Sequence, residues 1–353
     1  MFLSIVLSLM NSAFADDVIA DPQPFGLLHM WTTVYDMDEN EVADPAGYGD
    51  PEDDIGFKLR RTRAGISGVN DQTRYRVSVG MSSPFDATLN RGSESIDLVD
   101  AYFSWKALNG LWVTGGVQKV PVSREQIMSS SDLVLAERAA ASVWMVPNRE
   151  VGLLGDYTVD MKSSKLNVQA GVFNGNGSLL GDDNAGKMLA GRVEYTMGEG
   201  VYNTFGTTDG LVLGIAVDGY LNQDIATQDL GYGADVIVRA ASLSILGEFR
   251  MRTLSPTNTT VDVPAVLSET QQMGYLAQVG YSVGQFEPAV RYSSFDDNMD
   301  NVNAGDGSAI SIGCTWHSQK DTVRIGAGYE MRLEADAYAI SNDTARAWMM
   351  LRY

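Results

Sequence analysis

The sequence predicts an all-β protein in which about sixteen antiparallel strands close into a single membrane-spanning barrel. Three observations support this prediction. Apolar and polar residues alternate along many segments, long and short connections alternate between those segments, and no uninterrupted apolar run is long enough for a membrane helix. Glycine is abundant (36 residues) and proline scarce (10 residues), which suits many strands joined by turns.

The C-terminal strand shows the alternation most clearly. Every second position from the end is apolar or aromatic: Tyr353, Leu351, Met349 and Ala347. Arg346 and Arg352 lie at positions between them. A final strand of this kind, ending on an aromatic residue, resembles the last strand of Gram-negative outer-membrane barrels. We therefore expect its apolar face to meet lipid, its arginines to face an aqueous interior, and the strand to pair with the first one, Phe25–Tyr35.

Four other segments alternate as regularly: Arg74–Met81, Asp100–Lys106, Leu243–Arg252 and Val323–Arg332. The remaining strand candidates are weaker: Phe25–Tyr35, Ile55–Gly68, Leu111–Lys119, Glu150–Val159, Lys165–Asn174, Met188–Met197, Gly210–Asn222, Gly231–Ala241, Gln272–Val283, Gln285–Phe295 and Ser308–His317. The alternating loop lengths predict short periplasmic turns and long outer loops, with Gly198–Asp209 longer than its place in the series predicts.

A soluble β-sandwich would also alternate, but many of these strands are long enough to cross a bilayer at a tilt. Aromatic residues also fall towards strand ends, where they could form interfacial girdles: Phe57, Tyr75, Trp105, Tyr195, Tyr281, Tyr292, Trp316 and Tyr353. The barrel is therefore the favoured prediction.

The N-terminal segment, residues 1–15, predicts a cleaved signal peptide, although no Lys or Arg precedes its apolar core. Residues 16–353 then form one barrel domain. The formal net charge of −20 argues against a nucleic-acid partner. The single cysteine, Cys314, cannot form an internal disulfide, and its parity predicts a lipid-facing position.

Several stretches, in order along the chain, resemble the phosphate-selective porin O and P family: Gly56–Gly65, Val117–Gln126, Glu137–Arg138, Asn148–Gly152, Gly171–Gly175 and Glu287–Ser293. The resemblance implies a sixteen-stranded, usually homotrimeric outer-membrane porin for anions or general small solutes. It also implies that the third outer loop, residues 120–149, folds inward as a constriction. Its many apolar residues, such as Met128, Leu133 and Trp144, agree with this expectation, although packing against a neighbouring subunit is an alternative.

The interior of the barrel is predicted to be basic. Alternation along each strand places these cationic side chains on the face opposite the apolar one, which points inward: Lys58, Arg60, Arg74, Arg76, Lys106, Arg192, Arg239, Arg250, Arg252, Arg291, Arg324 and Arg332. Inward carboxylates are fewer: Asp100, Glu194, Asp218, Asp235, Glu248, Glu287 and Glu330. Arginines that pair with these carboxylates would only stabilise the barrel wall. Alternation alone does not distinguish such arginines from the arginines that contact solutes. Arg61 and Arg63 break the alternation and predict a bulge or side chains that reach for the interface.

The candidate pore-lining and constriction residues are Lys58, Arg60, Arg74, Arg76, Lys106, Lys119, Arg124, Glu125, Glu137, Arg138 and Arg149. They predict passive diffusion of small hydrophilic solutes and ions, either with a weak preference for anions or with little selectivity. In the family, phosphate selectivity is linked to clustered lysines at the constriction, and residues 120–149 contain none. The alternative is a structural or adhesive barrel with an occluded interior.

Other chemistry finds little support. His29 and His317 are the only histidines and have no evident catalytic partners, so we expect no enzyme, metal or cofactor. The acidic segment 36–54 resembles the start of a calcium loop but has Glu41 where glycine is needed, so a solvated loop is the better interpretation. The expected partners are outer-membrane lipid and lipopolysaccharide, small anions or neutral solutes, and two further copies of the chain.

Overall fold

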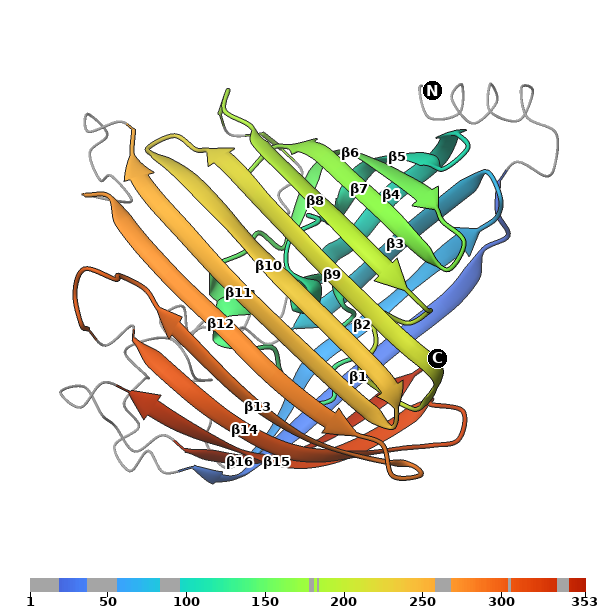
Figure 1. Ribbon diagram of the computed structural model, residues 1–353, viewed down its shortest axis with the longest axis vertical. Coiled ribbons are helices and arrows are strands. Elements are labelled where there is room, and N and C mark those ends of the chain that lie inside the picture. The colour runs from blue at the N-terminus through green and yellow to red at the C-terminus, as the bar shows by residue number, and fades with distance from the viewer. Residues whose placement is uncertain are drawn as a thin grey trace.

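The computed structural model describes residues 19–36, 56–82, 96–177, 181–182, 184–257, 268–303, 306–334 and 343–353. Within these ranges the chain forms sixteen strands and two short helices (Figure 1). The strands are β1 (Gln23–Asp36), β2 (Gly56–Val69), β3 (Thr73–Ser82), β4 (Asp97–Leu108), β5 (Leu111–Lys119), β6 (Arg149–Asp160), β7 (Ser164–Phe173), β8 (Met188–Met197), β9 (Thr208–Gln223), β10 (Thr227–Ala241), β11 (Leu243–Pro256), β12 (Thr270–Tyr281), β13 (Phe286–Asp296), β14 (Gly307–His317), β15 (Val323–Glu334) and β16 (Thr344–Arg352). The helices α2 (Arg124–Ile127) and α3 (Ala140–Trp144) lie between β5 and β6.

The sheet is a closed antiparallel barrel in which each strand pairs with its neighbours in sequence and β1 pairs with β16. The closing register places Leu27 opposite Arg352 and Trp31 opposite Trp348. Closure leaves no strand edge unpaired, which a lipid environment requires because it offers the backbone no water. The prediction of about sixteen strands, with the last closing on the first, is confirmed. Within the described residues no helix is long and apolar enough to cross a membrane.

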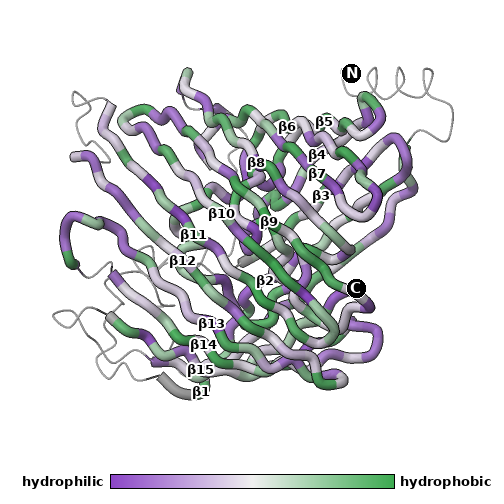
Figure 2. The backbone as a smooth tube through the Cα atoms, in the orientation of Figure 1, coloured by the Kyte–Doolittle hydropathy of each residue, from purple (hydrophilic) through white to green (hydrophobic). Residues whose placement is uncertain are grey.

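The two faces of the sheet follow the predicted alternation. On β11, for example, Phe249 is exposed on the outer face, whereas its neighbours Glu248 and Arg250 are buried inside the barrel. Figure 2 shows hydrophobic and hydrophilic residues alternating along the strands. Cys314 is free and exposed, as its parity predicts. An outer surface rich in exposed apolar side chains is suited to lipid.

The connections differ in length between the two ends of the barrel. At one end they are short, for example residues 161–163 and the single residue Ser242. The connection 198–207 at this same end is longer, and 224–226 at the opposite end is short. The predicted signal peptide and almost all of the acidic segment 36–54 lie outside the described residues, so their predictions remain untested.

Candidate functional site

The long connection between β5 and β6, which we call the inner loop (residues 120–148), folds into the barrel as predicted. Figure 1 shows its two helices inside the barrel, behind β10 and β11. Met128, Val134 and Met145 are each at most 1% exposed. A loop with such side chains is stable inside the barrel because the barrel wall removes them from water. The alternative, packing against a neighbouring subunit, is not what the structure shows.

The inner loop begins at a sharp turn held by Lys119. Its ammonium group donates to the backbone carbonyls of Gln126, Ile127 and Met128 at 2.8, 2.9 and 2.8 Å. Ser123 caps the start of α2, because its hydroxyl accepts from the Gln126 amide at 3.2 Å. The same hydroxyl donates to Glu248 on β11 at 2.7 Å. These bonds direct α2 towards β8–β11.

Ionic groups of β8–β11 then bury Arg124 of the inner loop. Arg124 lies 2.6 Å from Glu194 and 2.8 Å from Asp235. Arg192 bridges Asp218 at 2.8 Å and Asp235 at 2.6 Å. We call Arg192, Glu194, Asp218, Asp235, Glu248 and Arg250 the paired wall. With Arg124, three arginines meet four carboxylates in this region, so each guanidinium group is paired with carboxylates of the protein itself.

On the opposite side of the interior, Glu137 of the inner loop contacts two consecutive arginines. Arg60 donates to Glu137 at 2.7 Å, and Arg61 donates to both carboxylate oxygens at 2.7 and 2.6 Å. Both arginines point inward because β2 carries a bulge: the register passes from His29–Arg61 to Met30–Leu59 and leaves Arg60 as the extra residue. The bulge predicted from the broken alternation is confirmed.

The environment of Glu137 keeps its carboxylate ionised. Burial alone would raise the pKa of Glu137, but the guanidinium groups of Arg60 and Arg61 outweigh burial and hold this pKa well below its usual range. Arg61 also donates to Nδ1 of the buried His29 at 3.3 Å. His29 is thus part of the attachment of the inner loop.

Apolar contacts fill the space between these two attachments. Val134 and Leu135 of the inner loop pack with Ala289 of β13, and Ala139 packs with Ile237 and other inward residues of β10–β12. Further apolar contacts join α3 to Phe295 and the base of the loop to Phe173 and neighbouring residues. Along β8–β13 the interior is therefore a packed protein core.

A cavity of about 350 Å³ lies along the other part of the interior, beside β2–β6. It is lined by Arg63, Arg74, Arg76, Asp100, Tyr102, Ser104, Thr114, Gln118, Lys119, Ile127, Ser129 and Arg149. We call its five cationic residues, Arg63, Arg74, Arg76, Lys119 and Arg149, the basic wall. They meet a single lining carboxylate, Asp100, which lies 2.8 Å from Arg149 and 3.2 Å from Arg76. The inner loop contributes only the uncharged Ile127 and Ser129.

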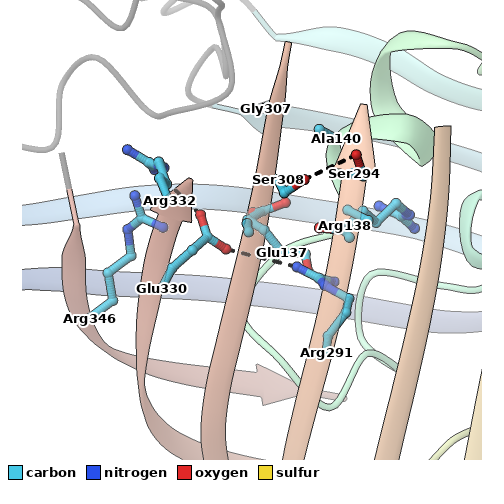
Figure 3. Close-up of a pocket in the computed structure, with 13 residues that line it drawn as sticks. Glu137, Arg138, Ala140, Arg291, Ser294, Gly307, Ser308, Glu330, Arg332 and Arg346 are labelled. Atoms are coloured by element: carbon cyan, nitrogen blue, oxygen red, sulfur yellow. Dashed lines mark hydrogen bonds and ion pairs between the residues drawn. The ribbon is translucent and has the colours of Figure 1, made fainter. Parts of the chain in front are cut away.

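A second, water-sized cavity of about 30 Å³ lies on another side of the inner loop. Figure 3 shows Arg138, Arg291, Arg332 and Arg346 gathered there with Glu137 and Glu330. Glu330 lies 4.0 Å from Arg291 and 3.4 Å from Arg332, so cations and carboxylates are interleaved. This cavity lacks the large excess of cations that lines the larger one.

The structure distributes the predicted pore-lining residues between these regions. Four line the larger cavity: Arg74, Arg76, Lys119 and Arg149. Four attach the inner loop: Arg60, Arg124, Glu125 and Glu137. Arg138 lines the smaller cavity and donates to the carbonyls of Glu125 and Met128. Lys58 lies beside Trp31 and Lys106 beside Trp112, each within 6.0 Å of the ring centre.

Arg63 is the residue of the basic wall that is missing from the predicted pore-lining residues. Strict alternation from Lys58 and Arg60 would point Arg63 outward, whereas one extra residue at Arg60 returns Arg61 and Arg63 to the interior. The motif Arg60–Arg63, in which only Thr62 is uncharged, is the signal that could have placed it. Within the described residues no cluster of His, Cys, Asp or Glu is arranged to hold a metal ion.

Comparisons with known proteins bear on this architecture. Residues 36–210 match the family model described as phosphate-selective porin O and P. Over these residues the chain belongs to that family. The match includes the inner loop and every residue of the basic wall, and a porin is a channel rather than an enzyme.

Solved structures share the fold of this porin at low sequence identity. The complex of Salmonella typhi OmpF with daunomycin has a TM-score of 0.62 at 12% identity, with 96% of this chain and 99% of that chain covered. An anion-selective porin from Comamonas acidovorans has a TM-score of 0.60 at 12% identity, with 95% and 100% covered. The outer membrane channel DcaP of Acinetobacter baumannii has a TM-score of 0.56 at 13% identity, with 96% and 99% covered. No curated protein sequence matches the chain significantly.

Proposed function

We propose that this porin lets small hydrophilic solutes diffuse passively with a preference for anions, and that they pass along the basic wall. The observation that carries the proposal is the lining of the larger cavity, where five cationic side chains meet one carboxylate. An excess of one sign in a narrow aqueous passage concentrates ions of the opposite sign. The overall charge of −20 does not oppose this, because salt screens charges more than about 10 Å away.

Neighbouring groups hold the cations of the basic wall in place. Asp100 joins Arg76 to Arg149, and the guanidinium of Arg74 stacks 3.7 Å from the ring centre of Trp112. Stacking leaves the N–H groups at the rim of the guanidinium able to donate to a passing anion. An anion that sheds part of its hydration shell can therefore exchange water for these donors along the wall.

The geometry argues for a general anion preference rather than phosphate specificity. Lys119 is the lysine next to the inner loop, and an ammonium group has three N–H donors. All three are accounted for by the carbonyls of Gln126, Ile127 and Met128. Lys119 thus adds charge to the passage while its hydrogen bonds hold the loop.

Reversal potentials in planar bilayers test this proposal. With purified porin and a potassium chloride gradient, we expect the potential to have the sign for chloride preference, and phosphate to compete weakly. A strong cation preference would contradict the basic wall as the selective element. Phosphate block at low concentration would contradict the general preference.

The alternative, a structural or adhesive barrel with an occluded interior, draws support from the packed core along β8–β13. Liposome swelling distinguishes the two. The diffusion channel admits small sugars and swells the liposomes, whereas an occluded barrel leaves them unchanged.

We further propose that the porin is exported with a cleaved leader at residues 1–15 and resides as a homotrimer in an outer membrane that contains lipopolysaccharide. The family match and the apolar outer face support this placement. N-terminal sequencing of the mature protein tests the leader. Chemical cross-linking in the native membrane tests the trimer, which would give a ladder ending at three subunits.

A further inference from the structure

The connection between β8 and β9, which we call the inner turn (residues 198–207), lies at the barrel end where the other connections are short. It folds into the barrel rather than away from it. Thr204 is 2% exposed and Phe205 is 5% exposed. A hydrophilic surface turn would leave such residues in water, so its sequence is suited to an interior position.

Two apolar side chains of the inner turn pack against the inner loop and the barrel wall. Phe205 joins the cluster of Val134, Leu135 and Ala289. Val201 packs against the cluster formed by Ala139 and inward residues of β10–β12. The inner turn and the inner loop therefore belong to the same packed core.

The wall beneath this core carries apolar side chains on its inward face. Ile237, Leu246, Leu276 and Ala289 point inward and are all at most 6% exposed, and all but Leu276 lie between polar or charged residues on the inward face of their strands. Four apolar side chains facing an aqueous passage would be unfavourable by roughly 25 cal/mol for each Å² exposed. Their presence requires a permanent cover, which the inner loop and the inner turn supply.

Hydrogen bonds fix the inner turn in this position. Arg239 of β10 donates to the carbonyls of Gly200, Phe205 and Gly206. The amide of Gly206 donates to Glu287 of β13 at 2.5 Å. Two more bonds reach the inner loop: Arg124 donates to the Val201 carbonyl at 2.9 Å, and Thr204 donates to the Asp132 carbonyl at 3.3 Å.

We propose that the inner turn is a second constricting element, which blocks the part of the interior along β10–β13 and supports the inner loop from the side of the short connections. Solutes are thereby confined to the basic wall, and the selectivity of the porin depends on a segment that does not touch the passage. This inference rests on the proposed diffusion along the basic wall.

A same-length replacement of residues 201–205 by glycine and serine tests the inference. It removes Val201 and Phe205 while keeping the connection, and heat-modifiable mobility in gel electrophoresis verifies that the barrel is folded. We expect single-channel conductance to rise, larger sugars to enter liposomes, and the reversal potential to move towards zero. The matched control replaces residues 161–163, a short connection at the same end, and should leave all three measurements unchanged.

The milder variant Phe205→Ala keeps the inner turn and should shift the same measurements in the same direction by a smaller amount. It provides the test if the replacement of residues 201–205 does not fold. Folded variants with the conductance and sugar cut-off of the unaltered porin would overturn the inference. Failure of the proposed anion diffusion would give a different result from failure of this inference. The unaltered porin would then lack anion preference, while conductance and sugar size would still report whether the inner turn blocks part of the interior.

Discussion

The basic wall and the paired wall belong to one barrel interior, and both present arginines at inward positions of their strands. In the paired wall, Arg192 and Arg250 are buried between carboxylates of adjacent strands and covered by the inner loop. In the basic wall, Arg74 and Arg76 line a cavity, and Asp100 is the one carboxylate among the lining residues. An inward arginine thus becomes structural or solute-facing according to the acids on neighbouring strands and the cover above it.

The largest difference between the walls should appear in stability. Arg192→Leu leaves Asp218 and Asp235 short of a partner in a buried site, so we expect a loss of about 3–5 kcal/mol in the free energy of unfolding. Arg76→Leu removes a partly exposed pair and should cost less than about 1 kcal/mol. Thermal unfolding in detergent micelles measures both. Equal losses would show that the two walls do not differ in this way.

Much of this arrangement could be predicted from the sequence. Period-two alternation indicates the strands and the inward direction of Arg74, Arg76 and Arg192, because side chains on a strand alternate between its faces. Alternation cannot show which strand neighbours supply a carboxylate, since that depends on register. It also cannot show that Glu125 reaches Arg291 at 3.0 Å, because this contact depends on the path of the inner loop.

The second prediction cancels the excess positive charge of the basic wall. The double variant Arg63→Glu and Arg76→Glu should move the reversal potential from the sign for anion preference to near zero, because the lining then carries as many carboxylates as cations. Lys320→Gln, an exposed change in the connection 318–322, is the control and should leave the potential unchanged. If the double variant kept its anion preference, solutes would be passing elsewhere.

The third prediction concerns the attachment at Glu137. Its pKa is lower in the folded porin than the value of about 4.3 in an unfolded chain, so its stabilising contribution is fully present above about pH 4.3 and declines as the pH falls further towards the folded-state pKa. Conductance should therefore stay constant from pH 7 to pH 5 and change only in stronger acid.

Glu137→Gln tests the same attachment without acid. It removes the charge that meets Arg60 and Arg61, and should weaken the attachment by about 1.5–3 kcal/mol and make single-channel currents noisier already at pH 7. Quiet currents at pH 7 in this variant would show that the inner loop is held without Glu137.

The smallest effect should come from the support beneath Arg74. Trp112→Leu removes the ring on which its guanidinium stacks, an interaction of about 0.5–1 kcal/mol at an exposed site. The charge remains, so the sign of the reversal potential should not change, but its size should fall slightly because Arg74 samples more orientations. Arg74→Gln is the reference, since it removes the charge itself and should lower the anion preference further. A Trp112→Leu effect as large as that of Arg74→Gln would mean that the orientation of Arg74, more than its charge, determines selectivity along the basic wall.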